Sequence, residues 1–219
     1  DELVRLARGS GASVFMVLHA ALAALLSKIG AGNDIPVGTP VAGRTDEALD
    51  GLVGFFVNTL VLRNDLTGNP TFHELVDRVR TTDLAAYAHQ DLPFERLVEV
   101  LNPERSLSRH PLFQTVLVVQ NDEPSTPVTP NLTVTREDVP ATQAKFDLQL
   151  NLTERHTETG DPDGLTGTLD YATDLYDETT AFPEFVREDQ RKTIALREDL
   201  NQAVDGVRAD LAGRAKRLR

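Results

Sequence analysis

Histidine, cysteine and acidic side chains build most catalytic and metal sites, and this chain uses them sparingly. It has five histidines and no cysteine, which excludes a thiol nucleophile, a thiolate zinc site and a disulfide scaffold. No two histidines are adjacent, and none forms a His-x-x-x-His or His-Glu-x-x-His pair, so we expect no metal site. A Gly-x-Ser-x-Gly elbow, a Walker loop and a dinucleotide fingerprint are also absent from the sequence. The residues alone therefore predict no self-contained catalytic constellation.

Two residues in one apolar segment, Gly54 and Asn58, need an explanation. Asn58 is a polar residue in an otherwise apolar run. A buried amide needs hydrogen-bond partners, so Asn58 either faces a cleft or fastens a neighbouring loop. Gly54 either allows another backbone to approach closely or is a plain turn glycine.

Charged side chains recur between residues 89 and 109. His89 and Asp91 precede a predicted helix whose first turn contains Glu95, and we interpret His89 as a capping or supporting residue rather than a general base. Arg105 and Arg109 flank a serine-rich turn. They could pair with Asp91 or Glu95, or meet a phosphate group. We favour the ion pair, because arginine forks match carboxylates.

The chain is acidic, with 34 Asp and Glu against 22 Lys and Arg among 219 residues, a net charge of −12. This balance argues against a nucleic-acid partner, and the length suits one domain or one lobe of a larger one. The apolar run from Val14 to Leu26 is too short to span a bilayer, so we expect a core helix and no membrane partner. The chain starts at Asp1 without a visible targeting segment, which we interpret as an internal start in a longer cytoplasmic polypeptide.

The first half of the chain predicts helices and strands in alternation. Ser13 as N-cap and Gly30 after the last periodic residue predict a helix over 14–29. A strand is expected over 35–41. The run 51–63 begins as a glycine-punctuated loop and ends as a strand, whose near-continuous apolarity predicts burial on both faces.

Two further helices and three strands are expected downstream. Thr71 and Glu74 have capping-box spacing, which predicts a helix to about residue 88. A second helix begins near Pro93 and ends at 102–103. Strands are expected over 113–120, 146–152 and 165–171, with the polar stretch 153–164 as a long hairpin loop.

The last 38 residues, 182–219, differ in character from the rest. Five apolar residues step by 4, 4, 3 and 4, which predicts an amphipathic helix with a narrow apolar seam. Basic residues crowd its C-terminal end, as the helix dipole favours. The seam consists of Leu196, Leu200, Val204, Val207 and Leu211.

Three segments, in this order, resemble consecutive signature motifs of the condensation domains of nonribosomal peptide synthetases. They are VGFFVNTL at 53–60, HQDLPFE at 89–95 and RSLSRHPLFQ at 105–114. The preceding helix and the segment IPVGTPVAGR at 35–44 also resemble that family. The resemblance covers about residues 1–176, and three ordered motifs are far more specific than one.

The resemblance implies half of a two-lobed fold. Condensation domains resemble two chloramphenicol-acetyltransferase-like lobes that face each other across a cleft. The family's His-His-x-x-x-Asp-Gly motif lies in the first lobe, and this chain has no His-His pair. The expected fold is therefore an α/β two-layer sandwich with a mixed sheet and packed helices. We expect residues 1–181 to be the C-terminal lobe of a condensation domain and 182–219 an amphipathic helical tail, which departs from the family pattern.

The reaction that the resemblance implies is amide formation between acyl and aminoacyl thioesters carried on the phosphopantetheine of carrier proteins. This lobe would supply the tunnel floor, with Gly54, Asn58 and Thr59 as tunnel candidates, and part of the carrier docking surface. Arg105 and Arg109 are candidates for the pantetheine phosphate. The expected partners are the N-terminal condensation lobe, peptidyl carrier proteins and adjacent synthetase domains. No cofactor is expected to bind directly, and the isolated chain is expected to be inactive.

Two other functions stay open at this point. A condensation-like lobe can be a non-catalytic module that recruits a partner protein, with the tail as a docking element. The chain could also belong to an ester-forming acyltransferase of the same superfamily. The donor and acceptor substrates are not indicated by the sequence.

Overall fold

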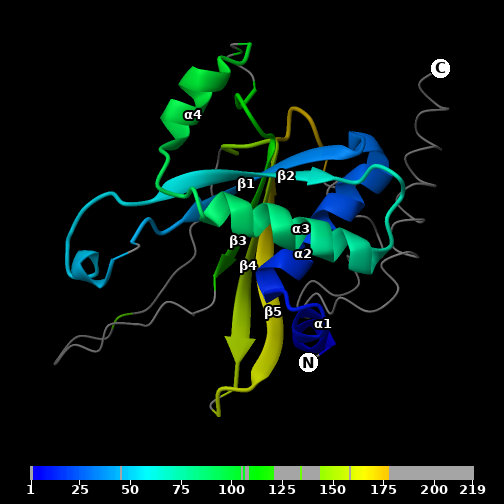
Figure 1. The fold of residues 1–219 in the computed structure, drawn as a ribbon, viewed down its shortest axis with the longest axis vertical. Coiled ribbons are helices and arrows are strands. Elements are labelled where there is room, and N and C mark those ends of the chain that lie inside the picture. Colours follow the sequence, from blue (N-terminus) through cyan, green and yellow to red (C-terminus); the bar gives the residue numbers. More distant parts are fainter. Residues whose placement is uncertain are drawn as a thin grey trace.

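A five-stranded mixed sheet lies at the centre of the fold, with its strands in the order β2-β1-β3-β4-β5 (Figure 1). The computed structural model describes residues 2–44, 46–104, 106, 109–120, 134, 144–157 and 159–177. β1, β3 and β4 run parallel, while β2 and β5 pair antiparallel with β1 and β4. The strands are β1 (Asp34–Val41), β2 (Asn58–Asp65), β3 (Thr115–Gln120), β4 (Leu148–His156) and β5 (Pro162–Tyr171).

The helices begin where their capping residues predict. The Ser13 hydroxyl accepts a hydrogen bond from the Met16 amide, 3.2 Å away, at the start of α2. Thr71 and Glu74 form the complete capping box at the start of α3. The described helices are α1 (Glu2–Gly9), α2 (Val14–Leu26), α3 (Phe72–Tyr87) and α4 (Phe94–Leu101), with short helical turns η1 (Ser27–Ala31) and η2 (Glu47–Leu49).

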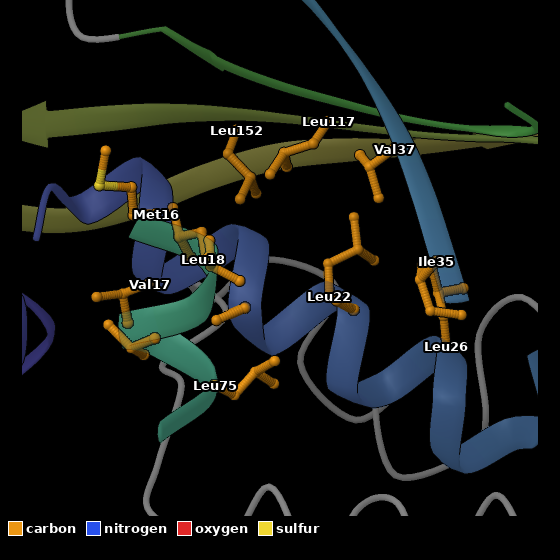
Figure 2. Close-up of a cluster of buried hydrophobic side chains, with 14 of the residues drawn as sticks. Met16, Val17, Leu18, Leu22, Leu26, Ile35, Val37, Leu75, Leu117 and Leu152 are labelled. Carbon is orange, nitrogen blue, oxygen red and sulfur yellow. The ribbon is translucent and has the colours of Figure 1, made fainter. Parts of the chain in front are cut away.

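The hydrophobic core lies between α2, α3 and one face of the sheet (Figure 2). α2 contributes more residues to it than any other described element, and its alanines Ala20 and Ala23 are fully buried, which allows close packing. The segment Val14–Ala31 is long and apolar enough to cross a membrane by length and composition alone. In the fold, however, α2 is the core helix that the sequence predicted.

The apolar run that ends at Arg63 was expected to be buried on both faces, and this is wrong. The run forms β2, which is an edge strand. Leu60, Leu62 and Asn64 are buried against the core, whereas Arg63 points outward and pairs with the Asp34 carboxylate at 2.7 and 2.8 Å. An edge strand with one packed face alternates in burial even where its sequence does not.

The polar stretch 153–164 was expected to be a loop, and most of it is strand instead. β4 continues to His156 and β5 begins at Pro162, so the connection is short. A register shift between Arg155 and His156 absorbs the irregularity. Cross-strand pairing between polar side chains, including an Arg155–Asp163 ion pair at 2.6 Å, supports the extended hairpin.

A mixed sheet with helices packed against it confirms the predicted α/β fold class. The proposed boundary at residue 181 and the helical tail over 182–219 lie outside the described residues.

Candidate functional site

The tunnel candidates Gly54, Asn58 and Thr59 lie where a long loop enters β2. This loop, residues 42–57, joins β1 to β2 and extends away from the sheet (Figure 1). Gly54 is exposed within it, and Asn58 and Thr59 are half-buried at the first two positions of β2. Asn58 and Thr59 therefore lie on the edge strand of the sheet, and Gly54 lies in the loop that leads into it.

Asn58 uses its side-chain amide to fasten the connector between α3 and α4. Its Nδ2 donates to the Gln90 carbonyl oxygen at 2.7 Å and to the Leu92 carbonyl oxygen at 2.8 Å. Its Oδ1 accepts from the Thr59 amide at 2.8 Å and from the Phe94 amide at 3.1 Å. All four hydrogen-bonding positions of the amide are occupied by backbone groups. Of the two roles considered from sequence, these contacts support the fastening of a loop.

The same contact explains how α4 begins. Pro93 is the N-cap of α4 and has no side-chain acceptor to offer the first helical amides. Asn58 Oδ1 takes that place from another strand by accepting from the Phe94 amide. The polar residue in the apolar run therefore caps a helix that begins 36 residues later.

Arg44 holds the 42–57 loop in shape. Its guanidinium donates to the carbonyl oxygens of Leu49 and Leu52, the latter at 2.8 Å, and lies 4.3 Å from the centre of the Phe56 ring. Gly43 has φ +65°, and a Cβ there would overlap the Phe56 carbonyl oxygen. Glycine is therefore required at this turn.

The loop presents a set of exposed apolar side chains, which we name the apolar loop: Leu52, Val53, Phe55 and Val57. Phe55 is 93% exposed and Val53 fully exposed. Several large apolar residues on one ordered loop are typical of a surface that another protein segment covers.

A small hollow of about 370 Å³ lies beside this loop, at the C-terminal ends of β1 and β3. Thr39, Val57, Tyr87 and Val119 are among its lining residues. Burial, with a smaller contribution from the Asp83 carboxylate, raises the pKa of Tyr87 to about 12. The Tyr87 hydroxyl is therefore protonated at neutral pH and can only act as a neutral donor or acceptor.

A cluster of four rings lies behind α4. Phe94 of α4, His110, Phe113 and Phe146 contact one another, with the His110 and Phe113 ring centres 4.0 Å apart. Burial lowers the pKa of His110, and a hydrogen bond with the Phe113 backbone opposes that shift. His110 is thus a packing residue of this ring cluster.

Three of the remaining predicted residues lie on the surface, His89 and Asp91 in the α3–α4 connector and Glu95 in the first turn of α4. His89, Asp91 and Glu95 are exposed, and the His89 backbone forms turn hydrogen bonds with Ala86 and Leu92. The capping or supporting role predicted for the His89 side chain stays a prediction.

The expected arginine pairs are only partly observable. Arg105 lies outside the described residues, so its role stays a prediction. Arg109 is described and exposed, but in the described part of the chain no ion pair joins it to Asp91 or Glu95. Burial and the Asp147 carboxylate raise the pKa of Tyr176, and the Arg109 charge opposes that shift.

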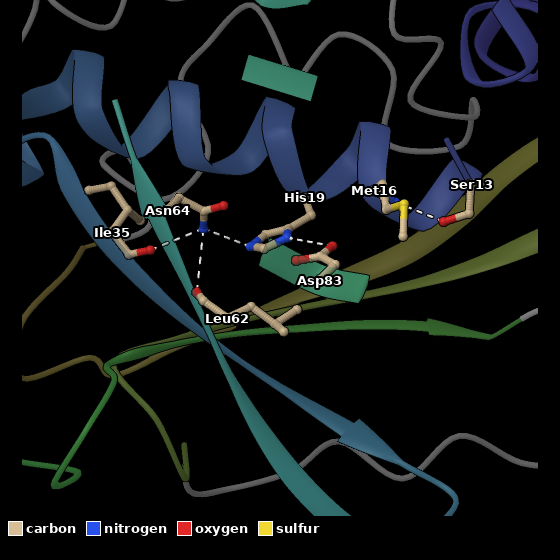
Figure 3. Close-up of polar contacts among 7 residues, drawn as sticks. All are labelled: Ser13, Met16, His19, Ile35, Leu62, Asn64 and Asp83. Atoms are coloured by element: carbon tan, nitrogen blue, oxygen red, sulfur yellow. Dashed lines mark hydrogen bonds and ion pairs between the residues drawn. The ribbon is translucent and has the colours of Figure 1, made fainter. Parts of the chain in front are cut away.

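A buried polar network links α2, α3 and β2 (Figure 3). His19 Nδ1 lies 3.1 Å from Asp83 Oδ2, and Asn64 Nδ2 lies 2.8 Å from His19 Nε2. Because the Asn64 amide donates to Nε2, the neutral imidazole carries its proton on Nδ1 and donates to Asp83. His19 and Asp83 are both 0% exposed, so this pair stabilises the core and cannot reach a substrate. The two partners of His19 lie 64 and 45 residues away along the chain.

Comparison with known proteins identifies relatives of one kind. The family model of the condensation domain matches residues 1–201. The chain is 56% identical over 179 residues to the probable non-canonical nonribosomal peptide synthetase CymA of Salinispora arenicola, and the match covers 82% of this chain and 2% of that protein. It is 53% identical over 180 residues to a dimodular nonribosomal peptide synthase of Bacillus subtilis, and this match covers 82% of this chain and 8% of that protein. The chain thus spans less than a tenth of these curated relatives.

Solved structures share the fold. The X-domain from teicoplanin biosynthesis has a TM-score of 0.77 and 37% identity, over 82% of this chain and 40% of that chain. An X-domain in complex with OxyB has a TM-score of 0.75 and 33% identity, over 93% of this chain and 42% of that chain. A four-domain nonribosomal peptide synthetase has a TM-score of 0.70 at 24% identity, over 96% and 16%, which supports the fold alone.

Proposed function

Because this chain belongs to the condensation-domain family found in nonribosomal peptide synthetases, we propose that it is the second lobe of a peptide-bond-forming condensation domain. In this proposal it supplies the floor of the condensation tunnel and part of the surface on which carrier proteins dock. The N-terminal lobe, peptidyl carrier proteins and adjacent synthetase domains are its partners.

The observation that carries the proposal is the apolar loop. Phe55 and Val53 project into solvent from a loop that Arg44 holds in shape, so the exposed surface is built rather than frayed. Such a surface fits a covering protein segment. Two observations support a first lobe as the covering segment. The sequence has no His-His-x-x-x-Asp-Gly motif, and this chain covers 40% of the X-domain chain.

The proposed reaction joins two carrier-bound substrates. The amine of the acceptor aminoacyl thioester attacks the carbonyl carbon of the donor acyl thioester. A C–N bond forms, the donor C–S bond breaks, and the donor phosphopantetheine leaves as a thiol with the proton lost by the amine. The first-lobe histidine would handle that proton, so this chain contributes positioning rather than acid–base chemistry.

In this scheme the chain's own residues hold the tunnel floor in place. Asn58 fastens β2 to the α3–α4 connector, and its Oδ1 also accepts from the Thr59 amide, while Val57 lines the neighbouring hollow. Gly54 keeps the loop free of a side chain where a Cβ would lie 2.9 Å from the Phe56 ring. These contacts support a rigid wall against which tethered substrates can be oriented.

The proposal is tested by joining this chain to a first lobe that carries the His-His motif. We expect the joined protein to form amide product on the acceptor carrier protein, measured by intact mass. The double variant Val53→Asp/Phe55→Asp should lose most of this activity, because two carboxylates in the lobe interface would be desolvated. Leu84→Asp, at a 46% exposed position of α3, is the matched control and should keep it. Full activity in the loop variant would contradict the proposal.

A second candidate is a non-catalytic module that recruits a partner protein. The observation that favours it is the likeness to the two X-domain structures, one of which was solved with OxyB. This function predicts that the joined protein binds a partner enzyme but yields no amide from loaded carriers. The product assay above therefore separates the two functions.

A further inference from the structure

A partly apolar groove that no other described residue covers lies on the helical side of the molecule, and none of the tunnel candidates lines it. It has a volume of about 890 Å³ and lies between α1, the outer side of α2 with η1, and the start of α3. Its apolar lining includes Leu3, Leu6, Ala21, Ala24, Leu25 and Phe72, all half-buried. These side chains belong to or flank the hydrophobic core, so the groove is an incomplete part of the core rather than an isolated surface patch.

The sequence contains one amphipathic segment long enough to follow this groove. The apolar seam of the tail runs from Leu196 to Leu211, 16 residues or about 24 Å as a helix. The groove follows α2 and η1 from Val17 to Lys28, about 17 Å along the axis. Gly206 lies inside the tail segment and disfavours an isolated helix. This segment therefore needs tertiary packing to be helical.

The topology brings the end of the described chain near the groove. β5 ends where β4 begins, since Tyr171 pairs with Leu148. β1, β3 and β4 are parallel, so their first residues share that edge of the sheet. β1 follows η1 directly, and η1 residues Ser27 and Lys28 line one end of the groove.

The connecting segment is long enough. Three strand spacings of about 4.8 Å separate β5 from β1, roughly 14 Å in all. The 18 residues between Asp177 and Leu196 can span up to about 60 Å. No crossing of the sheet is needed, because the groove and the core helices lie on the same face.

We propose that residues 196–211 form a helix that occupies this groove within the same chain, with the apolar seam against the outer side of α2. The tail then completes the core of this lobe, and it is not a free docking element. The inference is independent of the proposed function, because no residue that lines the groove belongs to the 42–57 loop of the expected lobe interface.

Disulfide trapping tests the proposal directly, because the chain has no cysteine of its own. Ala24→Cys in the groove is paired in turn with Leu200→Cys, Val204→Cys and Val207→Cys in the full-length chain. Under mild oxidation we expect at least one of these pairs to form an intramolecular disulfide, at a rate that does not depend on protein concentration. The matched control pairs Ala24→Cys with Gln202→Cys, on the opposite side of the tail helix, and should not react.

Three results would overturn the proposal: no disulfide in any seam pair, equal reaction of the control pair, or disulfides only between two chains. The last would assign the groove to a second copy. Thermal unfolding provides a readout without cysteine. Leu200→Asp should lower Tm by about 5–10 °C, and Gln202→Asp by less than about 2 °C. Equal Tm values for these two variants would also contradict a buried seam.

Discussion

The hydrogen bonds of Asn58 make a sharp prediction about one side chain. Asn58→Ala removes two donors to the Gln90 and Leu92 carbonyl oxygens and one acceptor for the Thr59 and Phe94 amides. Each such bond contributes about 0.5–1.5 kcal/mol net. Because Asn58 is only half-buried, water can replace part of the loss. We expect the free energy of unfolding to fall by about 2–3 kcal/mol.

The loss should be measured by urea denaturation together with hydrogen exchange of the Phe94 amide. That amide donates to Asn58 Oδ1, so its protection should fall more than that of amides inside α3. Asn151→Ala is the matched control, since this strand asparagine bonds the side chains of Thr168 and Asp170 at exposed positions. It should cost less than about 1 kcal/mol.

Asn58→Asp separates the donor half of the contact from the acceptor half. The aspartate keeps an acceptor for the Phe94 amide but turns an oxygen toward the two carbonyl oxygens. We expect it to destabilise at least as much as Asn58→Ala, because the donor positions become repulsive. Stability and Phe94 exchange unchanged in Asn58→Ala would refute the fastening role.

Three further predictions concern His110, Asp83 and Gly43. Burial lowers the pKa of His110 below its usual 6.5, so the unfolded state binds the proton first and stability should fall as pH drops below about 6.5. In urea titrations between pH 5 and 7, the free energy of unfolding of His110→Phe should depend less on pH than that of the wild type. The same pH dependence in both proteins would contradict this prediction. Asp83→Ala leaves the buried His19 Nδ1–H without its acceptor and should lower the free energy of unfolding by about 3 kcal/mol. Asp83→Asn should lower it by less, and an equal decrease in the two variants would be inconsistent with the network. Gly43→Ala should lower Tm by several degrees, about 4 °C or more, because the turn needs φ +65° and no Cβ; an unchanged Tm would show that the turn can relax.

Local signals predicted the elements of this fold well. Ser13 and the Thr71–Glu74 box mark the starts of α2 and α3, and Asn102 ends α4 in the left-handed conformation. These signals work because capping and turn residues act on their own neighbouring backbone. The errors concern longer-range effects. The residues of the run that ends at Arg63 do not indicate that it is an edge strand, because its neighbours in the sheet come from elsewhere in the chain. The polar residues 153–156 likewise do not indicate that β4 continues through them.

The candidate site was predicted as a set of positions but not as a set of contacts. The motif at 53–60 drew attention to Gly54, which is exposed in the loop before β2, and to Asn58, which is the first residue of that strand. The bond from Asn58 to Phe94 spans 36 residues, and the partners of His19 lie 45 and 64 residues away. Such pairings follow from the packing of α2, α3 and β2, which a single sequence does not reveal.

Amide formation by separated halves is the most direct test of the account. Three mixtures with loaded donor and acceptor carrier proteins should be compared: this chain alone, a first lobe with the His-His motif alone, and both together. We predict carrier-bound amide product only when both are present, with yield that rises with the concentration of this chain until the first lobe is saturated. Amide product from this chain alone would contradict the assignment of this chain as the second lobe of a condensation domain. The absence of amide product from two halves that are folded and associated would contradict it as well.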